Sequence, residues 1–164
     1  MIKITDIKSQ NKKALRMVLA YYDLYRTYEE AMRNMSYIAA ANNDGMPHGT
    51  SVGNPVQNKA MRLIDIEDKK KWIMVLDAMD STLSEKKRAF LRFRRDAENQ
   101  IEHAEKLPQG RPSWVPYVQA HYAVWFADRY GREVNPPCAR VMTRWMNDIV
   151  DVTVRIAIHE GMFE

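Results

Sequence analysis

Apolar residues recur at alternating steps of three and four between residues 10 and 41, a segment without Gly or Pro. This spacing puts them on one face of a helix and is typical of a helix that packs along another helix. We therefore expect one long helix over 10–41, with its Tyr and Met side chains covered by the next helix or by a second chain. The alternative is a tyrosine-lined groove for a ligand. The recurring positions are Val18, Tyr21, Tyr25, Tyr28, Met32, Met35 and Ala39.

The segment 42–55 interrupts the pattern with three Gly, two Pro and three Asn residues. These residue types favour a connector. Asn54 followed by Pro55 is typical of the first positions of a helix, so a second helix is expected from there to about residue 80. Because the connector is short, we expect the second helix to fold back antiparallel on the first.

A third helix is predicted from Glu85 to Lys106, after an interruption at 81–84 where the hydroxyl of Ser84 can cap it. The stretch 107–113 contains one Gly and two Pro residues and ends this helix. It is the best candidate for a boundary between a region over 1–107 and a region over 108–164.

The second region contains two predicted helices. Ser113 can cap the first of them and Gly131 is a natural residue to end it. The last helix covers Cys138 to Glu160 and closes at Gly161; its apolar stripe is Val141, Met142, Trp145, Ile149, Val152 and Ile156. The fold class that follows is all-α, with a long N-terminal helical hairpin and a C-terminal helix pair of the helix-turn-helix type.

Composition narrows the class of protein. The chain has 164 residues, 46% of them hydrophobic, which suffices for a folded core. Its single cysteine, Cys138, has no partner for an internal disulfide, and no stretch approaches the length of a membrane span. We expect a cytoplasmic protein that does not interact with membranes.

Catalytic and metal-binding patterns are weak in this sequence. The four histidines are scattered, and neither an HExxH motif nor a phosphate-binding glycine loop is present. We therefore predict that the chain is not an enzyme, and we expect neither a metal site nor a cofactor.

Positive charge is concentrated at the start of the third helix. The segment 86–95 holds six cations and no acid: Lys86, Lys87, Arg88, Arg92, Arg94 and Arg95. Arginine and lysine side chains in such a cluster suit phosphate oxygens, so these six are predicted phosphate-binding residues. The alternative is a solvated helix face balanced by nearby acids.

The last helix carries residue types that read bases in DNA. On the side opposite its apolar stripe, near its start, lie Arg140, Thr143, Arg144 and Asn147. Arginine forks onto guanine and asparagine onto adenine, so we predict these four as base-reading residues. The alternative is that they only keep a surface helix soluble.

Residues 45–73, GMPHGTSVGNPVQNKAMRLIDIEDKKKWI, resemble part of the small phage regulators of the RinA and ArpU type. In that group a Met-Pro-(His/Arg)-Gly turn leads through a polar spacer to a charged helix, and a sigma-like helix-turn-helix follows. The resemblance implies a transcription regulator of late phage or prophage genes.

Three classes of function are thus expected. The first is a phage or prophage DNA-binding transcription regulator, with double-stranded DNA as its partner and RNA polymerase or another host protein as a further one. The second is a phage-encoded inhibitor that binds a host nucleic-acid enzyme. The third is a small DNA-packaging subunit that forms a homo-oligomer through the seam of residues 10–41.

Overall fold

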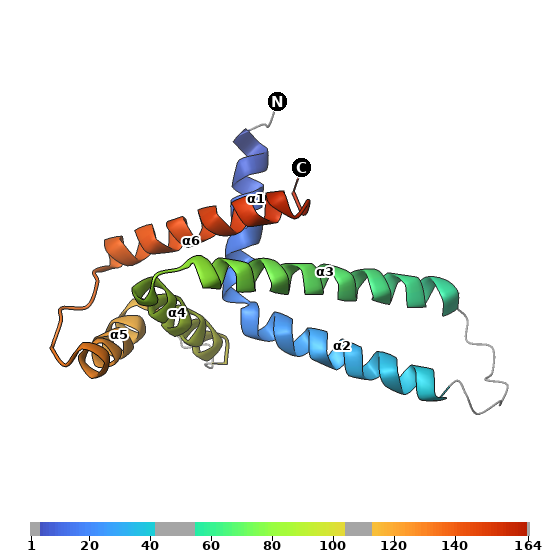
Figure 1. Ribbon diagram of the computed structural model, residues 1–164, viewed down its shortest axis with the longest axis horizontal. Helices are drawn as coiled ribbons and strands as arrows, with labels where there is room; N and C mark the ends of the chain where they lie inside the picture. Colours follow the sequence, from blue (N-terminus) through green and yellow to red (C-terminus); the bar gives the residue numbers. More distant parts are fainter. Residues whose placement is uncertain (1–3, 42–54, 104–112, 164) are drawn as a thin grey trace, which may run out of the picture.

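A computed structural model describes residues 4–41, 55–103 and 113–163 (Figure 1). This part of the chain forms six helices and contains no strand, which confirms the predicted all-α fold. The helices are α1 (Ile4–Leu19), α2 (Tyr21–Ala41), α3 (Pro55–Thr82), α4 (Glu85–His103), α5 (Val115–Tyr130) and α6 (Ala139–His159). Both predicted connectors and the proposed cap Asn54 lie outside the described residues, apart from Pro55, which begins α3, and Ser113. None of the described helices is long and apolar enough to cross a membrane.

Several predicted boundaries hold because local chemistry sets them. Ser84 lies directly before α4, and its hydroxyl accepts a hydrogen bond from the amide of Lys87 at 3.5 Å. Gly131 ends α5 with a φ of 65°, in the left-handed region that glycine adopts freely. Gly161 closes the last helix in the same way, with a φ of 69°. Ser113 is not the N-cap of α5: Trp114 holds that position, and the Ser113 hydroxyl accepts from the amide of Val115 at 3.3 Å.

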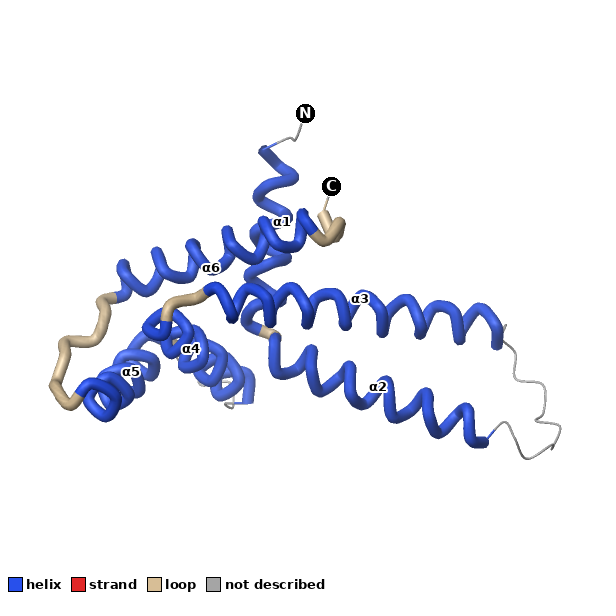
Figure 2. The backbone as a smooth tube through the Cα atoms, in the orientation of Figure 1, coloured by secondary structure: helices blue, strands red, loops and turns tan. Residues whose placement is uncertain are grey.

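The prediction of one helix over 10–41 is wrong, because the segment is divided at Ala20 into α1 and α2. The two helices run in clearly different directions (Figure 2). Helical hydrogen bonds flank the break, from Ala20 to Arg16 and from Leu24 to Ala20. Neither Gly nor Pro lies near it, so the break depends on packing against the rest of the molecule.

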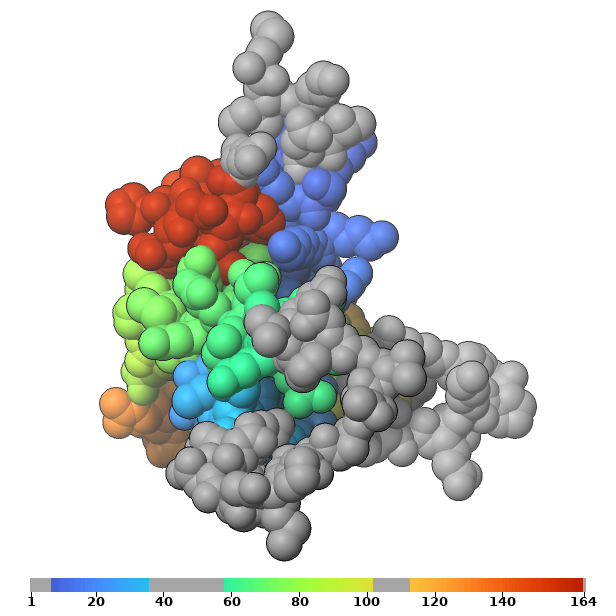
Figure 3. Space-filling model, turned by 90° about the vertical axis from the view of Figure 1, so that its right-hand side faces the viewer, coloured from blue at the N-terminus to red at the C-terminus, as the bar shows by residue number. Residues whose placement is uncertain are grey.

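Helix α3 is buried in its second half and exposed in its first. Figure 3 views the molecule from the right-hand side of Figure 1. In this view α1 and α6 lie on one side of α3, and α2 lies on the other. The core side chains Trp72, Leu76 and Met79 occupy this second half. The first half of α3 runs beside α2, away from the other helices (Figure 1), and we call these two segments the arm, residues 21–41 and 55–71.

The two C-terminal helices pack on different neighbours. Helix α5 lies against α4, whereas α6 lies mainly against α1 and α3. Tyr122 of α5 and Trp145 of α6 meet with ring centroids 6.0 Å apart. The buried face of α6 is also rotated from the predicted stripe, since Val141, Trp145, Val152 and Ile156 are only half-buried. Its buried residues are Met142, Met146, Ile149, Val150, Thr153, Val154 and Ala157.

Candidate nucleic-acid interface

The six cations of the segment 86–95 do not share one face of α4. Successive residues of a helix are turned by about 100°, so a dense run of cations points in every direction around the axis. Helix α4 touches α1, α5 and α6, and Phe90 and Leu91 on it are fully buried. Some of the cations therefore point into the fold and others toward solvent.

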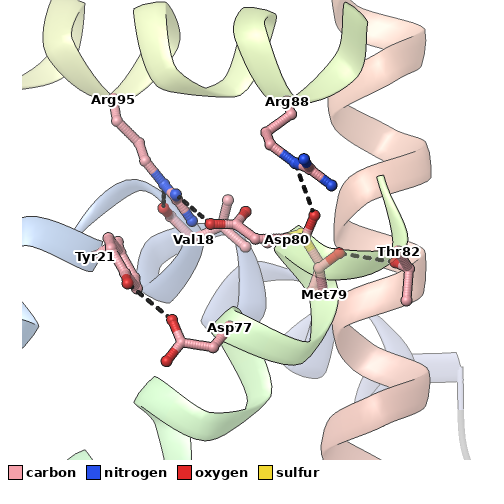
Figure 4. Close-up of polar contacts among 8 residues, drawn as sticks. All are labelled: Val18, Tyr21, Asp77, Met79, Asp80, Thr82, Arg88 and Arg95. Carbon is pink, nitrogen blue, oxygen red and sulfur yellow. Dashed lines mark hydrogen bonds and ion pairs between the residues drawn. The ribbon is translucent and has the colours of Figure 1, made fainter. Parts of the chain in front are cut away.

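Arg95 is buried, with an exposed fraction of 4%, and lies at the junction of three helices (Figure 4). Its Nε donates to the carbonyl of Val18 at 2.9 Å, two residues before the break between α1 and α2. Its Nη1 donates to the carboxylate of Asp80 at 3.0 Å, and its guanidinium lies 4.3 Å from the centre of the Tyr21 ring. Arg95 thus holds the break in place from within the fold.

Tyr21 makes a second contact between this junction and α3. Its hydroxyl donates to Asp77 at 2.8 Å (Figure 4). Burial and the hydrogen bond to the carboxylate raise the pKa of Tyr21 to about 12, so the hydroxyl keeps its proton at physiological pH. The first residue of α2 is therefore tied both to α4 and to α3.

Three further cations of α4 also have partners within the chain. Arg94 is 8% exposed; it donates to Glu98 at 2.6 Å and stacks on the ring of Trp114. Lys87 donates to Asp148 of α6 at 2.7 Å. The guanidinium of Arg88 donates to the carbonyl of Asp80, in the last turn of α3, at 3.2 Å (Figure 4). It also donates to the carbonyl of Leu83, directly after α3, at 3.2 Å.

The remaining two members of the segment, Lys86 and Arg92, are exposed. Lys86 lies 5.5 Å from the centre of the Phe126 ring, near the end of α5. Arg92 lies over the ring of its neighbour Phe93, at the rim of a groove between α4 and α5. Their charges are the ones that the fold leaves most open to a phosphate.

The four predicted base-reading residues are all exposed on α6. Arg140, Thr143, Arg144 and Asn147 follow one another along the outer side of its first half, while Met142 and Met146 face the core. The Thr143 hydroxyl donates to the carbonyl of Ala139 at 2.9 Å, an ordinary bond inside a helix.

Sequence analysis did not include the end of α5 in the candidate surface. Arg132, just past Gly131, lies 5.9 Å from the centre of the same Phe126 ring that Lys86 approaches. Arg129 donates to Glu85, the first residue of α4, at 2.7 Å. A signal was available in the sequence, because Arg129 and Arg132 flank the glycine that ends α5, a few residues before the predicted reading helix.

These elements together form a positively charged end of the molecule. The start of α4, the end of α5 and the start of α6 meet on the left of Figure 1. We call residues 85–88 and 129–148 the basic end; they hold seven arginines and lysines against three carboxylates. Two of those carboxylates, Glu85 and Asp148, already bind cations of the same surface. A surface of this kind attracts polyanions.

No group of three or more His, Cys, Asp and Glu side chains in the described ranges is arranged to hold a metal ion. The comparisons with known proteins identify no relative: no family model, no curated protein and no solved structure matches the chain.

Proposed function

We propose that the chain binds double-stranded DNA and acts as a phage or prophage transcription regulator. The observation that carries the proposal is the exposed row of Arg140, Thr143, Arg144 and Asn147 on α6. The first half of this helix stands on a packed core, so its outer side can enter a major groove without unfolding. The resemblance of residues 45–73 to phage regulators suggests the regulatory role.

The basic end would supply the contacts to phosphate. Lys86 and Arg132 flank the Phe126 ring, and Arg140 and Arg144 lie on the helix that follows. Backbone contacts fix the position of a protein on a duplex, whereas contacts to base edges select the sequence. We assign the first role to Lys86 and Arg132 and the second to the row on α6.

A second candidate function, binding to a host nucleic-acid enzyme, rests on the groove between α4 and α5. It has a volume of about 480 Å³, and its lining includes Phe93, Val124 and Trp125. Val124 is 62% exposed, so the groove presents apolar surface to solvent. Arg92 and Asp128 at the groove provide charges of both signs.

Binding to selected and unrelated DNA duplexes tests the first of these two functions, DNA reading by α6. Preferred duplexes are first selected from a random pool and then titrated beside an unrelated duplex. Arg144→Ala should lose about 1–3 kcal/mol on the selected duplex and much less on the unrelated one, because a contact to a base edge depends on sequence. Arg155→Ala is the matched control, since Arg155 is exposed on the second half of the same helix.

Equal losses in the two variants, or no sequence preference in the parent protein, would contradict base reading by α6. In that case the substitution Val124→Glu, which alters the groove, becomes the informative variant for binding to a host enzyme.

A further inference from the structure

The arm exposes large apolar side chains that a folded chain normally covers. On α2, Tyr25 is 44% exposed and Met32 is 45% exposed, although both belong to the seam predicted from the sequence. On the first half of α3, Met61, Leu63 and Ile64 are between 46% and 63% exposed. Two helices alone do not enclose a core, because each covers only one stripe of the other.

The two heptad positions of the α2 seam differ in their burial. Tyr21 and Tyr28 are half-buried and belong to the side that packs against the rest of the fold. Tyr25 and Met32 are also seven residues apart. They occupy the second apolar heptad position of α2, on the side next to Tyr21 and Tyr28. The exposed stripe is therefore continuous with an existing helix–helix interface, and it has the spacing that a further helix requires.

The charges beside this stripe alternate along α2. The order is Asp23, Arg26, Glu29 with Glu30, and Arg33. Arg26 and Arg33 bind Asp23 and Glu29 of their own helix, but the arginine side chains remain 64% and 68% exposed and can bind another partner. Such a pattern discriminates between two ways of pairing α2 with a copy of itself.

In a parallel pair in register, the charged flanks of the two copies would lie on opposite sides of the interface, so these charges would not meet unlike charges across it. In an antiparallel pair with its twofold axis beside residues 28–29, Tyr25 lies opposite the second copy's Met32. In the same register Arg26 faces residue 31 of the second copy, which is next to Glu30. Arg33 faces residue 24 of the second copy, which is next to Asp23. Unlike charges meet on the flank while apolar residues meet at the centre.

We propose that two copies of this chain dimerise through their arms, with the α2 helices antiparallel and Tyr25 against the second copy's Met32. The contact is isologous, as in most homodimers. Helix α2 has 21 residues, about six helical turns, so the contact extends along the helix on both sides of the twofold axis. The inference does not depend on binding to DNA.

Sedimentation velocity from about 1 to 100 µM tests the dimer. The parent protein should approach twice the 19.2 kDa of one chain as its concentration rises. Tyr25→Glu should weaken the association roughly tenfold or more, because it buries an unpaired charge at the centre of the interface. Met74→Glu is the matched control: Met74 is 57% exposed on α3 and lies outside the arm and the stripe. Both variants should keep the parent's helical circular dichroism.

Charge reversal and cross-linking test the orientation. Arg26→Glu and Glu30→Arg should each weaken self-association, and an equimolar mixture of the two should restore it. In a Cys138→Ser background, Tyr25→Cys and Met32→Cys should form a disulfide-linked dimer when mixed, and neither should do so alone. A monomer throughout the range, equal effects of Tyr25→Glu and Met74→Glu, or cross-linking of Tyr25→Cys with itself would each overturn the proposal.

Discussion

Arginines are prominent on α4 and on α6, and the fold uses them in opposite ways. Arg94 and Arg95 of α4 are 8% and 4% exposed and bind groups of their own chain. Arg140 and Arg144 of α6 are exposed beside Thr143 and Asn147. The difference follows from position, because Arg94 and Arg95 lie on sides of α4 that face the fold, whereas none of the described helices covers the outer side of the first half of α6 (Figure 1). A dense run of cations is therefore weaker evidence for a binding surface than a sparse row on the outside of the fold.

Substitution of Arg95 should have the largest effect on the stability of the fold. Arg95→Met removes the donor to Val18 and leaves the carboxylate of Asp80 without its cation. Loss of one member of a fully buried ion pair costs about 3–5 kcal/mol of unfolding free energy, and we expect about 2–4 kcal/mol here because the Asp80 side chain is 27% exposed. Urea unfolding followed by circular dichroism measures this cost.

Arg144→Met is the control for that experiment. It should change the unfolding free energy by no more than about 0.5 kcal/mol, as is usual for an exposed position. If the two substitutions had similar effects on stability, the distinction between the arginines of α4 and those of α6 would be wrong.

Substitution of Glu85, which joins α4 to the end of α5, should have a smaller effect on stability. The hydrogen bonds from Arg129 and Tyr130 hold the pKa of Glu85 below its ordinary value. A carboxyl with a lowered pKa in the folded state stabilises that state above its unfolded pKa, about 4.3, and the contribution is lost as the pH falls through the folded pKa. Glu85→Gln should therefore lower the melting temperature slightly at pH 7.

The difference in melting temperature between the parent and Glu85→Gln should shrink as the pH falls below the unfolded pKa and disappear once the pH has fallen through the lower folded pKa, where the parent carboxyl also becomes neutral. Thermal melts of both proteins across this range make the measurement. A difference that persisted in acid would show that the substitution acts through packing and not through the charge of Glu85.

The sequence predicts helix boundaries well where a local residue determines them. Gly131 and Gly161 adopt the left-handed conformation at helix ends, and Pro55 begins α3. The break at Ala20 has no such residue; it coincides with the hydrogen bond from Arg95, 77 positions along the chain, to Val18. A contact between residues so distant in the sequence leaves no periodic signal.

The candidate site, too, is only partly predictable from the sequence. The exposed row on α6 follows from helical periodicity, and all four of its residues face solvent as expected. The burial of Arg95 depends on Asp80 and Tyr21, which come from two other helices. Only the packed fold shows which cations of the segment 86–95 are already bound. Whether the accessible ones bind DNA stays a prediction.

The most direct test of the account is the salt dependence of binding to duplex DNA. Each phosphate contact contributes about 0.9 to the slope of log affinity against log salt concentration. Lys86→Gln combined with Arg132→Gln should reduce the magnitude of that slope by about 1.8. Lys8→Gln combined with Lys12→Gln removes the same charge from exposed positions of α1, outside the arm and the basic end, and should leave the slope unchanged. Equal changes in the two double variants, or no change in the first, would contradict the assignment of DNA binding to the basic end.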